Sequence, residues 1–203
     1  MKTRTRVLVA GVALSVLLSA SHLYGSGLGF GKMNDNRRRI RIGAEYFFPT
    51  EEDRNIRTAN WSAYFPIESL KTGNLSTYAG ITATYAYGDI TQLEGDFNQG
   101  TLREVNYENE AFGIGPGILA DLRIWRTAGF SLHVDASGSL IFYNEDFPAG
   151  GERYNFMWRA GPGIKLGRHL GITYQWMHVS NGQGLGPQNP SYDAQGITLQ
   201  YSY

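Results

Sequence analysis

Strict alternation of apolar and polar residues constrains this chain most, because it recurs along most of the sequence. In the segment 38–48, for example, Ile40 and Ile42 alternate with Arg39 and Arg41. Side chains of a β-strand point alternately to two faces, so this period of two predicts a strand with one apolar and one polar side. The pattern predicts eight strands, at 38–48, 60–68, 75–87, 112–124, 130–142 and 154–166 and as the two arms of a hairpin spanning 169–203.

The two faces of these strands differ in the size of their residues. The apolar face is large and aromatic, with Tyr and Trp near strand ends, and it includes the final Tyr203. Such a face suits lipid, whereas small and charged residues suit a narrow lumen. We predict an all-β fold, an eight-stranded antiparallel transmembrane β-barrel of the bacterial outer membrane. Alternation alone also leaves open a soluble lipocalin-like binder with reversed faces. The lumen face contains Gly43, Glu45, Gly113, Asp121, Asp135, Arg159 and Lys165.

The first residues predict export. Lys2, Arg4 and Arg6 precede an apolar run from 7 to 18, which is shorter than the roughly 20 residues of a spanning helix. We expect a signal peptide at 1–26, with its cleavage site left open, and an outer-membrane barrel at 27–203. Three of the 18 Lys and Arg lie in the signal, leaving 15 against 18 Asp and Glu, which gives no support for nucleic-acid binding. The absence of Cys excludes disulfides, thiol catalysis and a lipoprotein anchor.

The connections between the predicted strands alternate in length. Short links at 71–74, 127–129 and 167–169 alternate with longer ones at 49–59, 88–111, 144–153 and 181–192. Outer-membrane barrels have short periplasmic turns and long external loops. The pattern therefore places both termini on the periplasmic side and the tip of the last hairpin at the external rim.

Three reactive residue types lie near the tip of that hairpin. His178 and Ser180 share the apolar face of one strand, with Cα atoms roughly 6.5–7 Å apart, and Asp193 opens the partner strand on the same parity. A serine hydroxyl becomes a nucleophile when a histidine takes its proton, and a carboxylate orients the histidine. The alternative is that His178 and Ser180 are ordinary polar residues of the headgroup zone. Polar groups on a lipid-facing surface are costly unless partnered or functional, which favours the catalytic interpretation.

The motif His178-Val179-Ser180-Asn181, followed by a glycine-rich loop and Asn189-Pro190, resembles the lipid A 3-O-deacylases of the PagL type. The resemblance implies an eight-stranded barrel whose outward-facing triad hydrolyses the 3-position ester of lipid A, or lipopolysaccharide, in the outer leaflet. It implies Ser180 as nucleophile, His178 as base and Asp193 as the orienting carboxylate, with Asn181 or Asn189 as oxyanion donors. The family usually has Glu where this chain has Asp193. No metal or cofactor is implied.

Other interpretations remain open at the level of sequence. His133 and Asp135 also resemble parts of a triad, but their parity points to the lumen, which favours an interior hydrogen-bonded network. The whole chain also fits a non-catalytic barrel with a structural or adhesion role. A homodimer is neither indicated nor excluded by the sequence.

Overall fold

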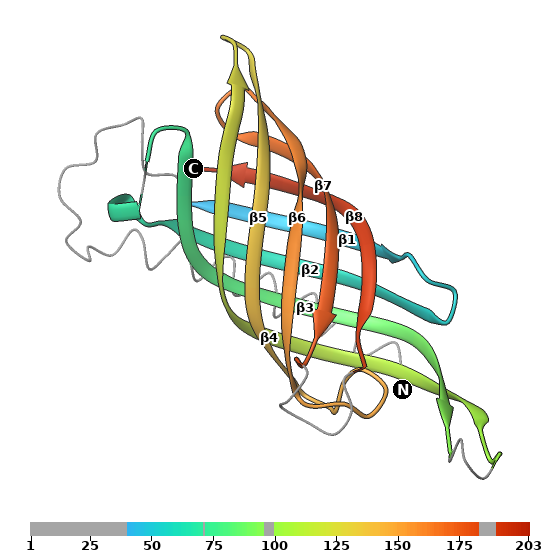
Figure 1. The fold of residues 1–203 in the computed structure, drawn as a ribbon. Coiled ribbons are helices and arrows are strands. Elements are labelled where there is room, and N and C mark those ends of the chain that lie inside the picture. The colour runs from blue at the N-terminus through green and yellow to red at the C-terminus, as the bar shows by residue number, and fades with distance from the viewer. Residues whose placement is uncertain (1–39, 71, 96–99, 183–189) are drawn as a thin grey trace, which may run out of the picture.

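The computed structural model describes residues 40–70, 72–95, 100–182 and 190–203. It is a closed antiparallel barrel in which each of eight strands pairs with its sequence neighbour and β1 pairs with β8, as predicted (Figure 1). A 3-10 turn, η1 (Glu68–Leu70), lies between β2 and β3. The predicted signal peptide lies outside the described residues. The strands are β1 (Arg41–Pro49), β2 (Arg54–Pro66), β3 (Leu75–Glu94), β4 (Arg103–Arg126), β5 (Phe130–Tyr143), β6 (Tyr154–Leu166), β7 (Leu170–Ser180) and β8 (Tyr192–Ser202).

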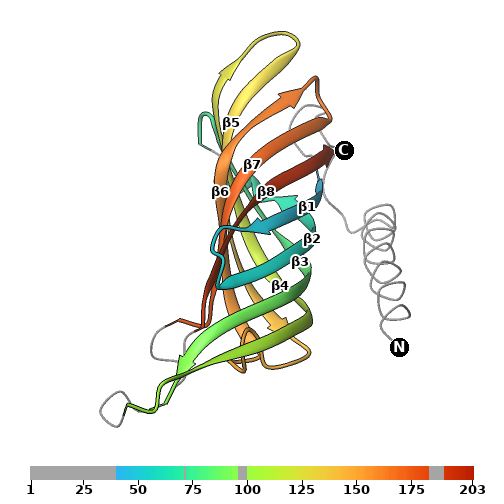
Figure 2. The same ribbon diagram turned by 90° about the vertical axis from the view of Figure 1, so that its right-hand side faces the viewer.

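The barrel closes where its first and last strands meet. Residues of β1 from Arg41 to Pro49 pair in register with β8 from Ser202 back to Ala194. The backbone N–H of Tyr203 donates to the carbonyl of Ile40 (3.0 Å), so the C-terminus lies beside the start of β1 (Figure 2). We call this end of the barrel, with the connections 67–74, 127–129 and 167–169, the short-turn end. The opposite end, with the connections 50–53, 95–102, 144–153 and 181–191, is the long-loop end.

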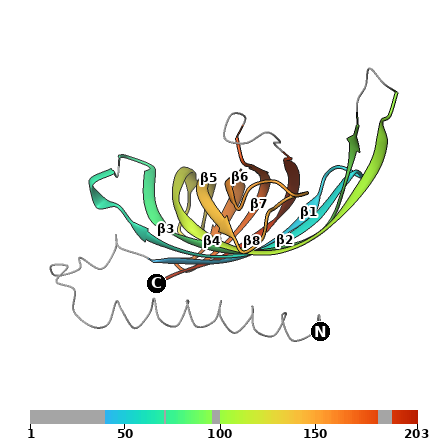
Figure 3. The same ribbon diagram turned by 90° about the horizontal axis from the view of Figure 1, so that it is seen from below.

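The strands β3 and β4 are longer than the sequence indicated. The segment 88–111 was expected to be a loop, yet Gly88 pairs with Asn109 and the ladder continues to Glu94 and Arg103. The resulting hairpin extends past the neighbouring strands at the long-loop end (Figures 1 and 3). Both of its faces are largely polar there, so no apolar alternation marked the extension. Contacts of Glu94 with Tyr107 and Arg103 join its two strands in addition to the ladder. In the same way, β2 begins at Arg54 instead of residue 60.

The exposed and buried residues show which face points outward. Large apolar side chains such as Trp158, Trp176 and Leu199 are about half exposed on the barrel wall, whereas inward charged residues such as Arg159 are buried. A soluble protein does not cover its whole circumference with large apolar side chains. The prediction of a lipid-facing apolar surface is confirmed, and the soluble alternative with reversed faces is wrong. No helix in the described part of the chain is long and apolar enough to cross a membrane.

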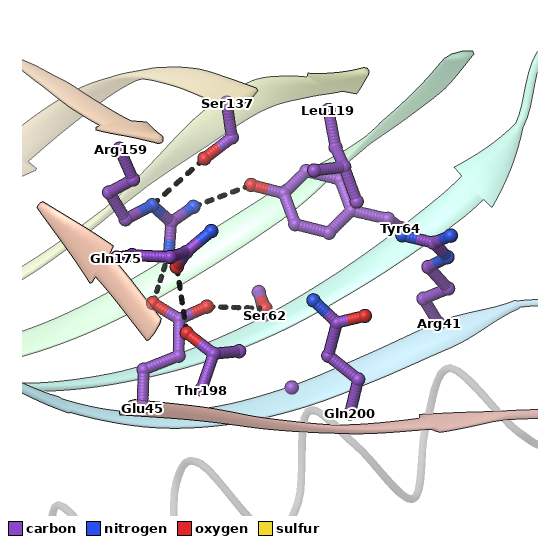
Figure 4. Close-up of a pocket in the computed structure, with 11 residues that line it drawn as sticks. Arg41, Glu45, Ser62, Tyr64, Leu119, Ser137, Arg159, Gln175, Thr198 and Gln200 are labelled. Atoms are coloured by element: carbon purple, nitrogen blue, oxygen red, sulfur yellow. Dashed lines mark hydrogen bonds and ion pairs between the residues drawn. The ribbon is translucent and has the colours of Figure 1, made fainter. Parts of the chain in front are cut away.

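The middle of the lumen is filled by a polar network around Arg159. Its guanidinium forms an ion pair with Glu45 and donates hydrogen bonds to the Tyr64 hydroxyl (2.7 Å) and to Ser137 Oγ (3.0 Å) (Figure 4). Ser62 Oγ donates to the second Glu45 oxygen (3.1 Å). The buried charges of Arg159 and Glu45 compensate each other, as burial of ionised groups requires. A cavity lined by this network is about 10 Å³, roughly the smallest that holds one water molecule.

The lumen at the long-loop end is apolar instead. A cluster of buried side chains from all eight strands is closed by Phe147 and Ala149 from the 144–153 connection, which folds into the mouth of the barrel. We call this cluster the outer plug. It positions the hairpin tip that contains the candidate site, because β7 and β8 both contribute buried residues to it. They are Met177, Val179, Tyr192 and Ala194.

Candidate active site

The pairing of β7 with β8 brings two of the three predicted residues together. His178 and Asp193 are directly opposite in the register, and both belong to the outward-facing parity. His178 Nδ1 lies 2.8 Å from Asp193 Oδ1, and each side chain is about one third exposed, 31% and 32%. An ionised carboxyl group only accepts hydrogen bonds, so Nδ1 is the protonated nitrogen of the ring. Nε2 is then left with the lone pair that a general base needs.

Ser180 lies two residues beyond His178 on the same outward face of β7. Its Cα is therefore about 6.5–7 Å from that of His178. No hydrogen bond joins Ser180 Oγ to His178 among the residues that the structure describes. Hydrogen bonds of catalytic groups are often long before substrate binds, so this geometry is compatible with proton transfer in a complex. The structure places all three residues on one patch of the barrel wall, with only the histidine–aspartate contact formed.

A tryptophan on the same strand contacts the imidazole of His178, and a second tryptophan is its partner on the neighbouring strand. Trp176, on the same strand, stacks against the imidazole with ring centroids 5.8 Å apart and planes 18° from parallel. Trp158 is the cross-strand partner of His178 on β6 and is also exposed. Alternation in the sequence indicated that both rings face outward, but only the register between β6 and β7 reveals that Trp158 adjoins the histidine.

Of the two proposed oxyanion donors, Asn181 and Asn189, the structure describes Asn181. Asn181 follows Ser180 directly and is 1% exposed, on the buried parity, whereas Ser180 faces outward. The backbone of Asn181 is thus adjacent to the serine, but its side chain lies on the other side of the strand. Asn189 lies outside the described residues.

His133 and Asp135 face the lumen, as their parity predicted. His133 Nε2 is 3.1 Å from Thr173 Oγ1, and Asp135 accepts a hydrogen bond from Gln200 Nε2 (2.7 Å). Together with Asp121 these residues offer three ligand atoms within 4.8 Å of one another. Cationic side chains already compensate the two carboxylates, since Arg41 contacts both and Lys165 contacts Asp121. The group is therefore an interior salt-bridge network.

The fold and the outward face define a class, a small outer-membrane barrel, here with a histidine–aspartate pair on its wall. A sequence model described as "PagL: Lipid A 3-O-deacylase (PagL)" matches residues 58–202. The chain belongs to this family of lipid A deacylases of the bacterial outer membrane. The matched span contains His178, Ser180 and Asp193.

A solved structure agrees on the fold. The crystal structure of the outer membrane enzyme PagL aligns with a TM-score of 0.52 at 13% identity, over 79% of this chain and 97% of that chain. The outer membrane protein Ail of Yersinia pestis aligns with a TM-score of 0.38 at 12% identity, over 82% of this chain and 100% of that chain. No curated protein sequence matches. These comparisons give no support to a homodimer.

Proposed function

We propose that the protein hydrolyses the 3-O-linked acyl ester of lipid A with Ser180 as nucleophile, His178 as general base and Asp193 as the orienting carboxylate. The observation that carries the proposal is the 2.8 Å contact between His178 Nδ1 and Asp193 Oδ1 on the outer wall of a barrel of this family. A histidine held through Nδ1 presents Nε2 toward a hydroxyl, which is the arrangement of serine hydrolases.

In the reaction, Ser180 Oγ attacks the ester carbonyl carbon while its proton passes to His178 Nε2. The resulting imidazolium is stabilised by Asp193, and it returns the proton to the sugar oxygen as the carbon–oxygen bond of the ester breaks. Water then attacks the acyl-serine, with His178 again taking the proton, and a free fatty acid leaves. Asn181 and Asn189 are the proposed donors to the oxyanion, Asn181 through its backbone N–H.

Substrate reaches this site from the side. The lumen is filled by the Arg159 network and the outer plug, so a lipid cannot approach through the barrel. A lipid in the outer leaflet meets the outward wall of β7 and β8 by lateral diffusion. His178, Ser180 and Asp193 lie within two or three residues of the long-loop end of their strands. We assign this end to the cell exterior. The three residues then lie at the depth where the lipid headgroups meet the acyl chains.

The shorter carboxylate does not prevent contact with the histidine. The resemblance implied a glutamate at this position, and Asp193 is one methylene shorter, yet its Oδ1 is within hydrogen-bonding distance of His178. Direct cross-strand pairing accounts for this, because opposite residues have Cβ atoms about 4.5–5.5 Å apart.

The test is incubation of the purified, micelle-embedded protein with lipopolysaccharide, followed by mass spectrometry of lipid A. We expect loss of one 3-hydroxyacyl chain by the wild type and none by Ser180→Ala. Ser131→Ala is the matched control, since Ser131 lies at the short-turn end of β5. An unchanged lipid A mass with wild type, or undiminished deacylation by Ser180→Ala, would refute the proposed mechanism.

A structural or adhesion role is the second candidate function. The observation in its favour is the β3–β4 hairpin, which extends past the neighbouring strands and exposes Leu93 (67%) and Leu102 (42%). Shortening this hairpin separates the two functions, because deacylation at β7 and β8 is then expected to continue while any adhesion of whole cells is lost.

A further inference from the structure

The start of β8 is held by several hydrogen bonds from the segment 50–54. Arg54, the first residue of β2, donates from Nη1 to the Ser191 carbonyl (2.6 Å) and to Ser191 Oγ (3.1 Å). The carbonyl of Asp193 accepts from the backbone N–H of Thr50 (3.2 Å) and from Thr50 Oγ1 (3.1 Å). The backbone on both sides of residue 192 is thereby tied to the 50–54 segment.

Tyr192 anchors the same segment from inside the lumen. Its side chain is fully buried, and its hydroxyl lies 3.1 Å from Thr58 Oγ1 on β2. Its ring meets that of Phe147 edge to face, with centroids 5.8 Å apart. Phe147 belongs to the 144–153 connection. This connection also lies close to Pro190, two residues before Tyr192, because a Cβ added at Gly151 would be 2.9 Å from Pro190 Cγ.

These contacts bear on the residue that follows. Successive side chains of a strand point to opposite faces, so an inward Tyr192 and a fixed carbonyl at 193 direct the Asp193 side chain outward, where His178 is its cross-strand neighbour. Aspartate has a single methylene between backbone and carboxylate. The carboxylate therefore follows any backbone shift directly, whereas the longer glutamate adjusts through an additional torsion.

We infer that Tyr192 and Arg54 are positioning residues, which together hold the backbone of Asp193 so that its short carboxylate reaches His178 Nδ1. The inference rests on the proposed function for its catalytic consequence, but the contact that it concerns is defined without any substrate. Neither residue touches the reacting atoms: Tyr192 faces the lumen, and Arg54 binds the chain two residues before the aspartate.

The test uses two variants that remove the same hydrogen bond from opposite sides, Tyr192→Phe and Thr58→Val. Loss of one neutral hydrogen bond corresponds to about a three- to tenfold change. We expect kcat to fall by about that factor with KM unchanged, and the double variant to be no worse than either single one. In the free protein, proton NMR is expected to show the Nδ1–H signal of His178 broadened by faster exchange with water. Arg54→Gln is also expected to lower kcat and to broaden the His178 signal. Arg54→Lys is expected to show a smaller change in both.

A rescue experiment distinguishes positioning from general destabilisation. Asp193→Glu is expected to lower kcat in the wild-type background, where the backbone is set for the shorter side chain. In the Tyr192→Phe background the longer carboxylate compensates for the shifted backbone, so the same change is expected to be less harmful or beneficial. A general loss of stability predicts an equal or larger penalty in that background, and heat-modifiable gel mobility confirms that each variant forms the barrel.

The outcomes are separable from those of the proposed function. An unchanged His178 signal in Tyr192→Phe, Thr58→Val and Arg54→Gln, or an equal Asp193→Glu penalty in both backgrounds, overturns the positioning role. Absence of deacylation by the wild type overturns the proposed function alone, because the NMR measurement needs no turnover and still decides whether the aspartate is held by these residues.

Discussion

Two histidine–aspartate pairs lie in the described part of the barrel, one in the lumen and one on the outer wall. His133 and Asp135 are buried in the lumen. There His133 contacts Thr173, and Asp135 contacts Gln200 and Arg41. The pair on the outer wall, His178 and Asp193, forms one direct contact and keeps about a third of each side chain exposed. The same two residue types are thus closed off from a reactant by burial in one place and open to a reactant in the other.

The difference shows why environment, and not residue type, identifies a candidate active site. A buried group that takes part in a charge network contributes to folding, since breaking such a network leaves uncompensated charge. A histidine with one nitrogen held and the other available is suited to move a proton. We therefore expect substitutions in the lumen to change stability and substitutions on the wall to change turnover.

The largest expected effect is on His178. His178→Gln removes the proposed base and is expected to lower kcat by about 10³-fold or more, as in other serine hydrolases. The matched variant His133→Gln is expected to keep kcat within about twofold. Initial rates of acyl release from lipopolysaccharide measure both. A comparable loss in His133→Gln would break the distinction between the two pairs.

Next in size is the lumen network around Arg159. Arg159→Met leaves the buried Glu45 carboxylate without its cation and is expected to lower the free energy of unfolding by about 3–5 kcal/mol. Urea unfolding in lipid vesicles measures this loss, and the double variant Glu45→Gln with Arg159→Met is expected to recover part of it. Deacylation at 25 °C is expected to stay near the wild-type rate. A large fall in turnover with normal stability would contradict the assignment of the lumen to folding.

Asp193→Asn is expected to have an intermediate effect on activity. Loss of the carboxylate removes the partner that orients His178, and we expect kcat to fall about 10- to 100-fold. The same substitution in a fully buried triad lowers kcat roughly 10⁴-fold. We expect a smaller loss here because His178 is about one third exposed, so water can replace part of the lost hydrogen bonding. Barrel assembly, followed by heat-modifiable mobility, is expected to be unchanged. Failure to assemble would instead make Asp193 a folding residue like Asp135.

The smallest effect is expected at Trp176, whose ring stacks on His178. A tryptophan face stabilises a cationic partner by about 0.5–1 kcal/mol at exposed sites, so Trp176→Leu is expected to lower kcat about two- to fivefold. Trp125→Leu, at the other end of the barrel, is the control and is expected to leave kcat unchanged. Equal losses in the two variants would show that the tryptophans act only through the membrane interface.

The orientation of the side chains was predictable from sequence, since a period of two assigns every residue of a strand to one face. His178, Ser180 and Asp193 were placed on the wall, and His133 in the lumen, on this basis. The rule fails at a bulge between Arg123 and Trp125, after which Trp125 pairs with the outward Leu132 and is itself exposed beside Ile124. One additional residue in a strand reverses the parity that follows it.

Contacts between strands were less accessible to sequence reasoning. The opposition of His178 and Asp193 depends on the register of β7 and β8, which a connection as long as 181–191 does not fix. The ion pair of Glu45 with Arg159 joins residues 114 apart in the sequence, across the lumen. The contact of Arg54 with Ser191 and that of Tyr192 with Thr58 each join β2 to the start of β8. Because these strands are far apart in the sequence, the contacts are visible only in the closed barrel.

The outer plug has a consequence for the permeability of the membrane that contains this protein. Apolar side chains fill the mouth at the long-loop end, and the Arg159 network behind them encloses a cavity of about 10 Å³, with room for about one water molecule. Ions and nutrients therefore have no continuous wet route through the described part of the barrel. A cell that makes many copies gains sites on its surface without becoming leaky, and planar bilayers containing the purified protein should stay electrically silent.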